Sequence, residues 1–405
     1  MEKRKNPAVR FKGFEDDWEQ RKLGELISEY KKTVDSSCTL PVLTSSKTEG
    51  VILQEEHFGR KQQHDITGYN VLPRSYCTYR NRSDGVDFTF NVNECCDMGI
   101  ISKFYPVFCG NDNDTYFLSL VLNNSDEVVH EIAYTCTGTG QKVLSFLDLQ
   151  KMSIRAPRHN EQKKISAYFK QLDHLITLHQ RKLEKMQLVK KSMLEKMFPK
   201  NDLKIPEIRF EGFTDDWEQR KLDDLAEFSK GSGYSKGDLI ESGTPIILYG
   251  RLYTNYETII SDVDTFVEAK DGSVYSKGRE VIVPASGETA EDIARAASVD
   301  KSGILLGGDL NIVMPNEDIN SAFLAISISN GSSQRELARK AQGKSVVHIH
   351  NEEIRNLVVP FPTKTEQNKI ENYFADLDHL ITLHQRKLAK MKSIKKSLLE
   401  KLFVQ

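Results

Sequence analysis

The stretch LDHLITLHQRKL occupies residues 172–183 and recurs, letter for letter, at residues 377–388. The similarity extends well beyond these twelve residues, to EQKKISAYFKQLDHLITLHQRKLEKMQLVKKSMLEKMF at 161–198 and EQNKIENYFADLDHLITLHQRKLAKMKSIKKSLLEKLF at 366–403. The two copies keep a constant offset of 205 residues. Self-similarity at a fixed offset indicates a chain that is built from two related halves.

A second repeat lies upstream of each copy. It reads VRFKGFEDDWEQRKL at 9–23 and IRFEGFTDDWEQRKL at 208–222, and it contains both tryptophans of the chain, Trp18 and Trp217. The segments between the two repeats scarcely match. The sequence therefore predicts a frame that is built twice and that carries two different heads.

The longer repeat has the periodicity of a coiled-coil helix. Steps of four and three residues from its first isoleucine place apolar side chains on one seam, interrupted by a histidine. A polar residue on such a seam commonly fixes the register, so we expect the two seam histidines to be structural. The predicted seam consists of Ile165, Phe169, Leu172, Ile176, His179, Leu183, Met186, Ile370, Phe374, Leu377, Ile381, His384, Leu388 and Met391.

Helix-boundary signals frame both copies. Asn160 and Thr365 are predicted N-caps, with Pro157 and Pro362 shortly before them, and Pro199 should stop the first helix. Each helix would be about 55 Å long at about 1.5 Å per residue. We expect the two helices to form an antiparallel coiled-coil pair that holds two globular units apart.

The predicted fold class is α/β, with a pseudo-twofold internal repeat. Short apolar and β-branched runs such as LPVLTSSKTEGVILQ and GTPIILYGRLYTNYETII, punctuated by Gly and Pro, indicate mixed α/β heads. The segments 143–157 and 348–362 share an apolar pattern and are predicted to be strands or turns that lead into the helices. The predicted division is a first head at 1–159, a central spacer helix at 160–198, a linker at 199–222, a second head at 223–364 and a C-terminal spacer helix at 365–405.

Composition excludes several classes of protein. The 405 residues contain no apolar run long enough to span a membrane, and the amino terminus MEKRKNPAVR lacks the apolar core of a secretory signal. We therefore expect a cytoplasmic chain with reduced, mostly buried cysteines. The net charge is −2, yet the segment 161–198 has nine Lys and Arg against four Asp and Glu. The overall charge therefore does not exclude a nucleic acid as partner.

No catalytic or metal site is predicted. The triplet at residues 343–345 is not a P-loop, because Ala338 stands where the first glycine is required. The glycine-rich stretch at 230–237 lacks the acidic residue that a dinucleotide site needs. His348 and His350 have no further ligand cluster nearby, so a metal is the less favoured interpretation.

Polar and aromatic loop stretches in the heads are the remaining candidates. Their side chains can bond base edges or phosphates, although ordinary solvated loops have the same composition. The candidate DNA contacts are Ser46, Lys47, Arg60, Lys61, Tyr79, Arg80, Arg82, Tyr249, Arg251, Tyr253 and Lys344.

Taken together, these features resemble the specificity subunit of type I restriction–modification enzymes over the whole chain. Each half has a WEQRKL block, a variable head, a P-x-x-x-EQ-x-x-I entry and a long helix. The resemblance implies that each head is a target-recognition domain that reads one half of a bipartite, asymmetric site in double-stranded DNA. It also implies that the helix pair sets the length of the unread spacer.

The resemblance further implies partners that carry out the chemistry. Two modification subunits would bind S-adenosylmethionine and methylate adenine, and translocase–nuclease restriction subunits would use ATP and magnesium. This chain itself would be non-catalytic and would bind no cofactor. The alternative is a two-domain coiled-coil scaffold that binds proteins and does not recognise DNA, but such a scaffold would not explain why the frame is repeated while the heads diverge.

Overall fold

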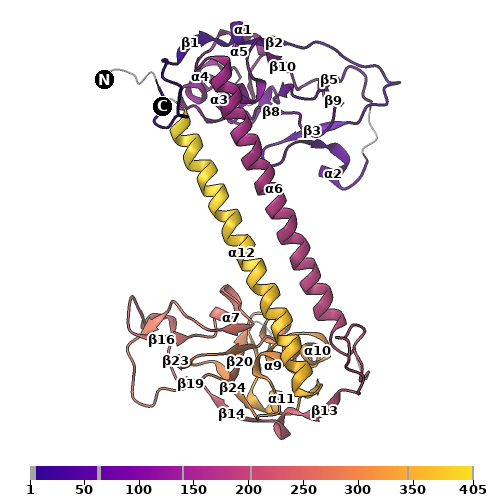
Figure 1. The fold of residues 1–405 in the computed structure, drawn as a ribbon, viewed down its shortest axis with the longest axis vertical. Helices are drawn as coiled ribbons and strands as arrows, with labels where there is room; N and C mark the ends of the chain where they lie inside the picture. The colour runs from indigo at the N-terminus through magenta and orange to yellow at the C-terminus, as the bar shows by residue number, and fades with distance from the viewer. Residues whose placement is uncertain (1–5, 62–64, 139–140, 201–202, 344–345, 404–405) are drawn as a thin grey trace. The chain divides into compact units, whose positions relative to one another are not determined.

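The computed structural model describes residues 6–61, 65–138, 141–200, 203–343 and 346–403, and it divides into two compact units (Figure 1). Unit 1 consists of Met1–His179 with Lys387–Gln405, and unit 2 consists of Gln180–Arg386. Each unit combines one head with a stretch of both long helices. No helix in the described part of the chain is long and apolar enough to cross a membrane.

The first half of the chain contains six helices and twelve strands among the described residues. Its strands are β1 (Glu19–Lys22), β2 (Ile27–Glu29), β3 (Leu43–Ser46), β4 (Gly50–Leu53), β5 (Asn70–Pro73), β6 (Cys77–Thr78), β7 (Arg82–Ser83), β8 (Asn91–Val92), β9 (Met98–Ile101), β10 (Val107–Gly110), β11 (Lys142–Val143) and β12 (Ser153–Ala156). Its helices are α1 (Leu23–Leu26), α2 (Gln54–Phe58), α3 (Thr115–Asn124), α4 (Asp126–Thr135), α5 (Phe146–Lys151) and α6 (His159–Lys196).

The second half follows a similar order. Its strands are β13 (Glu218–Lys221), β14 (Ala226–Lys230), β15 (Leu239–Ile240), β16 (Thr244–Ile247), β17 (Ile259–Ile260), β18 (Phe266–Val267), β19 (Tyr275–Lys277), β20 (Glu280–Pro284), β21 (Ser286–Gly287), β22 (Ala297–Val299), β23 (Ser302–Leu306), β24 (Leu310–Pro315), β25 (Val347–His348) and β26 (Val358–Phe361). Its α-helices are α7 (Arg251–Thr254), α8 (Ala290–Ile293), α9 (Ser321–Ile328), α10 (Gly331–Lys340), α11 (Asn351–Arg355) and α12 (Lys364–Leu402). Two short 3-10 helices are η1 (Leu222–Asp224) and η2 (Lys236–Asp238).

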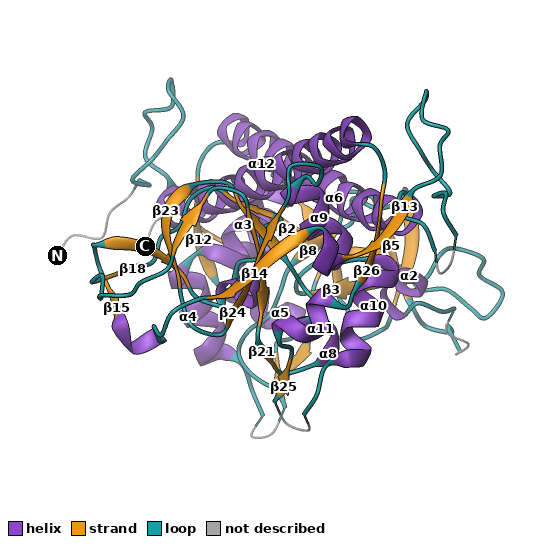
Figure 2. Ribbon diagram, turned by 90° about the horizontal axis from the view of Figure 1, so that it is seen from below, coloured by secondary structure: helices purple, strands orange, loops and turns teal. Residues whose placement is uncertain are grey.

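An equivalent sheet lies in both heads, although their sequences scarcely align. The strand order is β2-β10-β6-β8 in unit 1 and β14-β24-β20-β22-β17 in unit 2. Cys77 of β6 lies opposite Phe108 of β10, as Val281 of β20 lies opposite Val313 of β24. Helix α3 packs against the first sheet and α9 against the second (Figure 2). The predicted mixed α/β fold is confirmed, and the heads share a topology that their sequences do not reveal.

Each long helix begins with a buried glutamate that is paired with an arginine of the upstream repeat. Glu161 accepts two hydrogen bonds of 2.7 Å from the guanidinium of Arg10. Glu366 accepts the equivalent bonds of 2.7 and 2.8 Å from Arg209. Both glutamate side chains are at most 2% exposed. A bidentate pair of this kind fixes the upstream repeat to the first turn of the helix.

The next residue, a glutamine, attaches the helix to the head. The side-chain oxygen of Gln162 accepts a hydrogen bond of 3.0 Å from the N–H of Asp114, which is the N-cap of α3. Gln367 accepts a bond of 2.8 Å from the N–H of Asn320, the N-cap of α9. Each glutamine also donates to the carbonyl of the proline five residues earlier, at 2.9 Å. The EQ dipeptide therefore joins the helix, the upstream repeat and the head.

Both tryptophans lie in cores that are closed by the far end of the other long helix. In unit 1 the ring of Trp18 is 5.8 Å from that of Phe117 and 6.5 Å from that of Phe403, which follows α12. The equivalent rings in unit 2 are those of Trp217, Phe323 and Phe198. The last phenylalanine of each repeat copy thus packs into the core around the head of the other copy.

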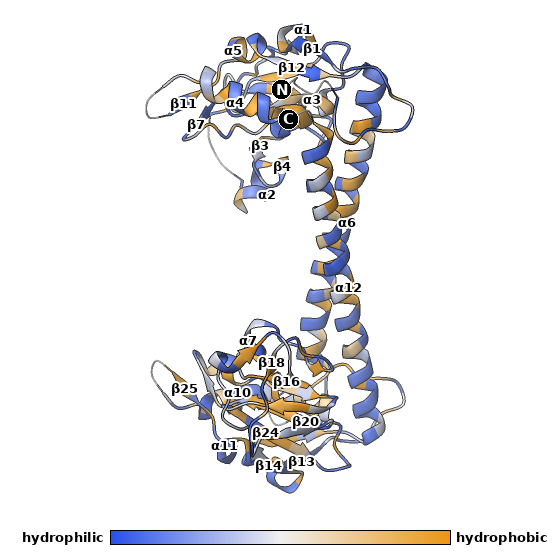
Figure 3. Ribbon diagram, turned by 90° about the vertical axis from the view of Figure 1, so that its left-hand side faces the viewer, coloured by the Kyte–Doolittle hydropathy of each residue, from blue (hydrophilic) through white to orange (hydrophobic). Residues whose placement is uncertain are grey.

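The two long helices run in opposite directions within each unit. In unit 1, Lys395 of α12 forms an ion pair of 2.5 Å with Asp173 of α6. In unit 2, Lys190 of α6 forms the equivalent pair, also 2.5 Å, with Asp378 of α12. All the predicted seam side chains are buried or half-buried. In Figure 3 apolar and polar residues are interspersed along both helices, as an amphipathic pattern requires.

Two details of the predicted helix entry are wrong. Asn160 and Thr365 lie in the first turn and are not N-caps, because the N–H groups of the buried glutamates already bond to the carbonyls of Arg158 and Thr363. The segments before the helices were predicted as strand or turn, but each contains a short helix, α5 or α11, before its strand.

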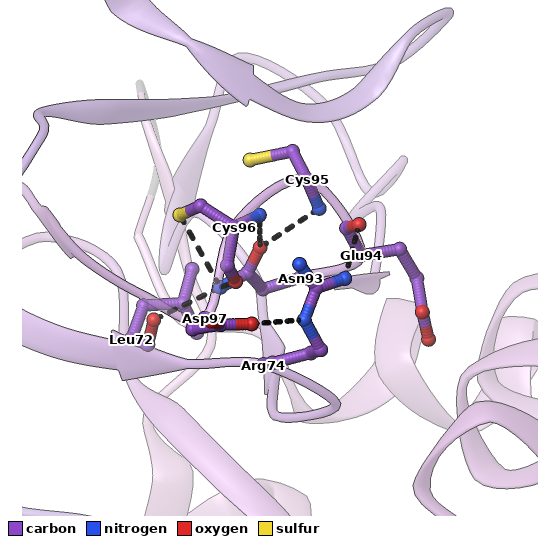
Figure 4. Close-up of polar contacts among 7 residues, drawn as sticks. All are labelled: Leu72, Arg74, Asn93, Glu94, Cys95, Cys96 and Asp97. Carbon is purple, nitrogen blue, oxygen red and sulfur yellow. Dashed lines mark hydrogen bonds and ion pairs between the residues drawn. The ribbon is translucent and has the colours of Figure 1, made fainter.

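The expectation that most cysteines are buried is also wrong. Cys77 is buried, whereas Cys95 is exposed and the other four are half-buried. In Figure 4 the side-chain oxygen of Asn93 accepts hydrogen bonds from the N–H groups of Cys95 and Cys96. Partial burial and the adjacent Cys96 thiol raise the pKa of Cys95 to about 11. This exposed thiol is therefore protonated at neutral pH and is a poor nucleophile.

The buried ion pair at the start of α6 leads to a stability prediction. Arg10→Ala leaves the Glu161 carboxylate desolvated and without its guanidinium, which should cost about 3–5 kcal/mol of unfolding free energy. Urea unfolding should be followed by the fluorescence of Trp18 in a Trp217→Phe background, so that the signal reports on unit 1.

Arg21→Ala is the matched control, because the ion pair of Arg21 with Glu25 is exposed and 3.4 Å long. An exposed pair contributes less than about 1 kcal/mol. An equal loss of stability in the two variants would contradict a special role for the buried pair.

Candidate functional site

A cavity of about 490 Å³ opens on the head of unit 1 between the β3–β4 hairpin and the segment after β6. Three of the predicted DNA contacts, Lys47, Arg80 and Arg82, line it. Lys47 stands in the hairpin turn, and the arginines follow the two-residue strand β6. Asp84 and Asp87 also line the cavity. The fold therefore brings together basic residues that lie far apart in the sequence.

The cavity has an excess of positive charge. Lys47 forms an ion pair with Asp87, and the hydrogen bond from Lys47, followed by that from Ser83, lowers the pKa of the Asp87 carboxyl. Among the residues that the structure describes, Arg80 and Arg82 have no carboxylate partner within ion-pair distance. Two exposed, unneutralised guanidinium groups beside a cavity are suited to phosphates or to the acceptor edges of bases.

The other candidates of unit 1 differ in their positions. The Ser46 hydroxyl closes the hairpin turn by accepting backbone hydrogen bonds at 3.2 and 3.3 Å. Arg60 and Lys61 are exposed after α2, outside the lining of the cavity. The prediction for Tyr79 is wrong, because its side chain is fully buried and its hydroxyl donates to the carbonyl of Leu144 at 3.2 Å.

Arg251 in unit 2 is also not placed as predicted. Its side chain is 11% exposed and forms ion pairs of 2.8 Å with Glu257 and 3.0 Å with Asp264. It donates in addition to the carbonyl of Asp262 at 3.1 Å. These bonds hold the loop that follows α7, so the guanidinium is engaged within the protein and is not presented to a ligand.

Tyr249 and Tyr253 of unit 2 lie at the same short helix. Tyr249 is 38% exposed and can offer its ring to a ligand. Tyr253 is half-buried, and its hydroxyl donates to the carbonyl of Ser286 at 2.7 Å. Burial raises the pKa of Tyr253, so the hydroxyl stays protonated. Lys344 lies outside the described residues.

The sequence did not single out the other residues of the cavity. Asp84 and Asp87 stand in the segment RSDGVDF, whose Asp-Gly dipeptide is a turn signal and carries no functional information. The role of Asp87 follows only from its ion pair with Lys47. His348 and His350 were considered only as metal ligands, and the described residues hold no group of three His, Cys, Asp or Glu that could bind a metal ion.

Comparison with known proteins gives consistent matches. The family model of the type I restriction modification DNA specificity domain matches twice, over residues 15–188 and 214–393. The specificity subunit of type I restriction enzyme MjaVIII from Methanocaldococcus jannaschii is 22% identical over 275 residues, which span 65% of this chain and 64% of that protein. The chain thus matches slightly less than two thirds of this relative's length.

The chain also aligns with solved structures over nearly its whole length. The S subunit of a type I restriction–modification system from M. genitalium aligns with 98% of this chain and 99% of its own, with a TM-score of 0.62 and 13% identity. The HsdS subunit of Thermoanaerobacter tengcongensis aligns with 96% of this chain and 97% of its own, with a TM-score of 0.44 and 16% identity. The first of these likenesses shows a common architecture over the whole chain.

The ion pair in the cavity leads to a prediction for DNA binding. Asp87→Asn removes the carboxylate that neutralises Lys47, so duplex DNA should bind more tightly and with a steeper salt dependence. Lys47→Ala should weaken binding and reduce the slope of log affinity against log salt by about one. Fluorescence anisotropy at several salt concentrations measures both.

Asp97→Asn is the control, because Asp97 lies in the same head, pairs with Arg74 at 2.8 Å and is outside the cavity lining. If Asp97→Asn strengthens binding as much as Asp87→Asn does, the effect reflects overall charge and the cavity is not the anion site.

Proposed function

The chain belongs to the type I restriction–modification DNA specificity family, and we propose that it selects the DNA site at which a type I restriction–modification complex acts. One observation carries this proposal: the specificity-domain model matches both halves of the chain, and each half supplies one head. Two heads on one chain are suited to a site with two specified parts. The same match favours DNA recognition over the protein-binding scaffold.

The difference between the heads makes the proposed site asymmetric. Symmetric DNA-binding dimers read two identical half-sites because their two readers are identical. Here the frame is repeated, but the exposed residues of the heads differ: unit 1 presents the basic cavity with Arg80 and Arg82, whereas in unit 2 Arg251 is held in internal ion pairs. Each head should therefore read its own half-site.

We propose that partner subunits supply all the chemistry. Two modification subunits with S-adenosylmethionine would methylate adenine, and restriction subunits would use ATP and magnesium to translocate and cut DNA. This chain would be non-catalytic, would hold no cofactor and would act in the cytoplasm, where these partners and their DNA substrate are found.

A repeated apolar stripe on the long helices supports two identical docking sites. Leu175 and Leu178 of α6 are 37% and 40% exposed, and their counterparts Leu380 and Leu383 of α12 are 43% and 37% exposed. Exposed apolar side chains at equivalent positions mark surfaces suited to protein partners. Because the stripe occurs once per repeat copy, it matches two copies of one partner.

Reconstitution with the modification subunits tests this function. The complex should methylate adenine within a motif of two specified halves separated by unspecified bases, whereas the purified chain with S-adenosylmethionine should methylate nothing. Sequencing of methylated adenines gives the motif. Methylation by the chain alone, or a motif that does not depend on the chain, would overturn the proposal.

The stripe provides the matched variants for this experiment. In Leu178→Glu combined with Leu383→Glu, both docking sites would have to bury an unpaired carboxylate, which costs several kcal/mol, so methylation should fall about a hundredfold or more. Leu188→Glu is the control, because Leu188 is an exposed leucine of α6 whose counterpart is a serine. Native mass spectrometry reports how many modification subunits each variant binds.

A further inference from the structure

A small two-stranded element, here named the edge ribbon, occurs in both heads. It consists of β7 with β11 in unit 1 and of β21 with β25 in unit 2. Val143 lies opposite Arg82 in the first ribbon, and His348 lies opposite Ser286 in the second. Val143 and His348 are separated by the same 205 residues as the helix copies. The ribbon is therefore an equivalent part of two heads whose sequences differ.

The same backbone constraints shape both ribbons. Thr137 and Val143 exchange two backbone hydrogen bonds of 3.2 and 2.9 Å, as Gln342 and His348 do at 3.1 and 2.8 Å. Each strand follows a glycine with positive φ, +104° before β11 and +142° before β25, where a Cβ would come within 2.3 Å or less of a backbone oxygen. No other residue type fits these two turns without rearrangement.

Different side chains fix the ribbon at the same carbonyl. The second strand of the ribbon is followed by Leu144 in unit 1 and by Ile349 in unit 2. Each donates its N–H to the carbonyl of the residue before the first strand of the ribbon, at 3.0 Å in unit 1 and 3.1 Å in unit 2. Its carbonyl accepts from the hydroxyl of Tyr79 at 3.2 Å in unit 1 and from the amide of Asn311 at 2.9 Å in unit 2. Both donors are fully buried. The position of the ribbon is thus held in both heads by unrelated residues.

The exposed residues of the two ribbons differ in chemistry. In unit 1, Arg82 lines the basic cavity, with its guanidinium 5.0 Å from the centre of the Phe104 ring. In unit 2 the exposed ring of His348 has its Nδ1 atom 3.2 Å from the hydroxyl of Ser286. This ring stacks on the exposed ring of His350, with 6.4 Å between the ring centres and an angle of 5° between the ring planes. In Figure 3 the ribbon of each head lies on the side away from α6 and α12.

We infer that the edge ribbon reads a base in each half-site and that Arg82 and His348 are its specificity-determining residues. This inference rests on the proposed function. An arginine whose guanidinium lies over an aromatic ring can donate two bonds to guanine O6 and N7. Because the Ser286 hydroxyl engages Nδ1 of His348, Nε2 is the ring nitrogen that remains for a hydrogen bond with a base edge.

Methylation motifs of the reconstituted complex test the inference. Arg82→Ala should relax one position in one half-site and lower the methylation rate at the original site by about ten- to a hundredfold. His348→Ala should do the same in the other half-site only. Arg82→Lys should relax the same position as Arg82→Ala, because a lysine keeps the charge but cannot form the bidentate contact.

Two exposed residues away from the ribbons serve as controls. Arg21→Ala in unit 1 and Glu227→Ala in unit 2 should leave both motif and rate unchanged. If Arg82→Ala and His348→Ala slow methylation but leave the motif intact, the ribbons only hold phosphates and the inference is overturned. If the variants behave as wild type on a bipartite motif, the inference fails while the proposed function stands. The absence of any bipartite motif with the wild-type chain would overturn both.

Discussion

The buried carboxylate at the start of each long helix is the constraint on which the rest of the structure depends. A desolvated carboxylate is costly unless it is paired and hydrogen-bonded. Glu161 and Glu366 meet this requirement by accepting bidentate hydrogen bonds from Arg10 and Arg209, respectively. The adjacent glutamine bonds to the N-cap of the first helix on the head, α3 or α9. Two successive side chains therefore set the position of helix, upstream repeat and head together.

The frame is nearly the same in the two halves of the chain, whereas the heads differ between them. Core contacts of the frame recur in both halves: Phe403 closes the core of unit 1 as Phe198 closes that of unit 2. The heads share a sheet order and an edge ribbon, but equivalent ribbon positions carry unlike residues: Arg82 corresponds to Ser286, and His348 corresponds to Val143. A common interior with different surfaces is the arrangement that lets one scaffold read two unlike DNA sequences.

The long helices and the repeat could be predicted from sequence because the apolar periodicity from Ile165 to Met186 extends over about six turns and appears twice. The topology of the heads could not, since strands such as β6 have two residues and pair with distant segments, as Thr78 does with Val107. The surroundings of Tyr79 and Arg251 could not be predicted for the same reason. Both residues stand in polar, aromatic stretches, and their tertiary partners, Leu144 and Asp264, cannot be recognised from local sequence.

The EQ dipeptide shows what could not be predicted from the sequence alone. Its recurrence at both helix starts was visible in the sequence, but a glutamate beside a helix N-terminus is normally exposed and favoured by the helix dipole. Only the structure shows that Glu161 is buried against Arg10, which lies 151 residues earlier in the chain. By contrast, the basic residues Lys47, Arg80 and Arg82 were predicted by type, and the fold brings them to one cavity.

The most direct test of the central claim, that two heads on a repeated frame read DNA independently, is a head exchange. Residues 24–156 would be replaced by the equivalent head of another family member, keeping Glu161, Gln162 and both long helices. Methylated adenines would then be sequenced for the complex with its modification subunits. The account predicts a new first half-site with an unchanged second half-site and an unchanged spacer. A change in both half-sites, or in neither, would contradict it.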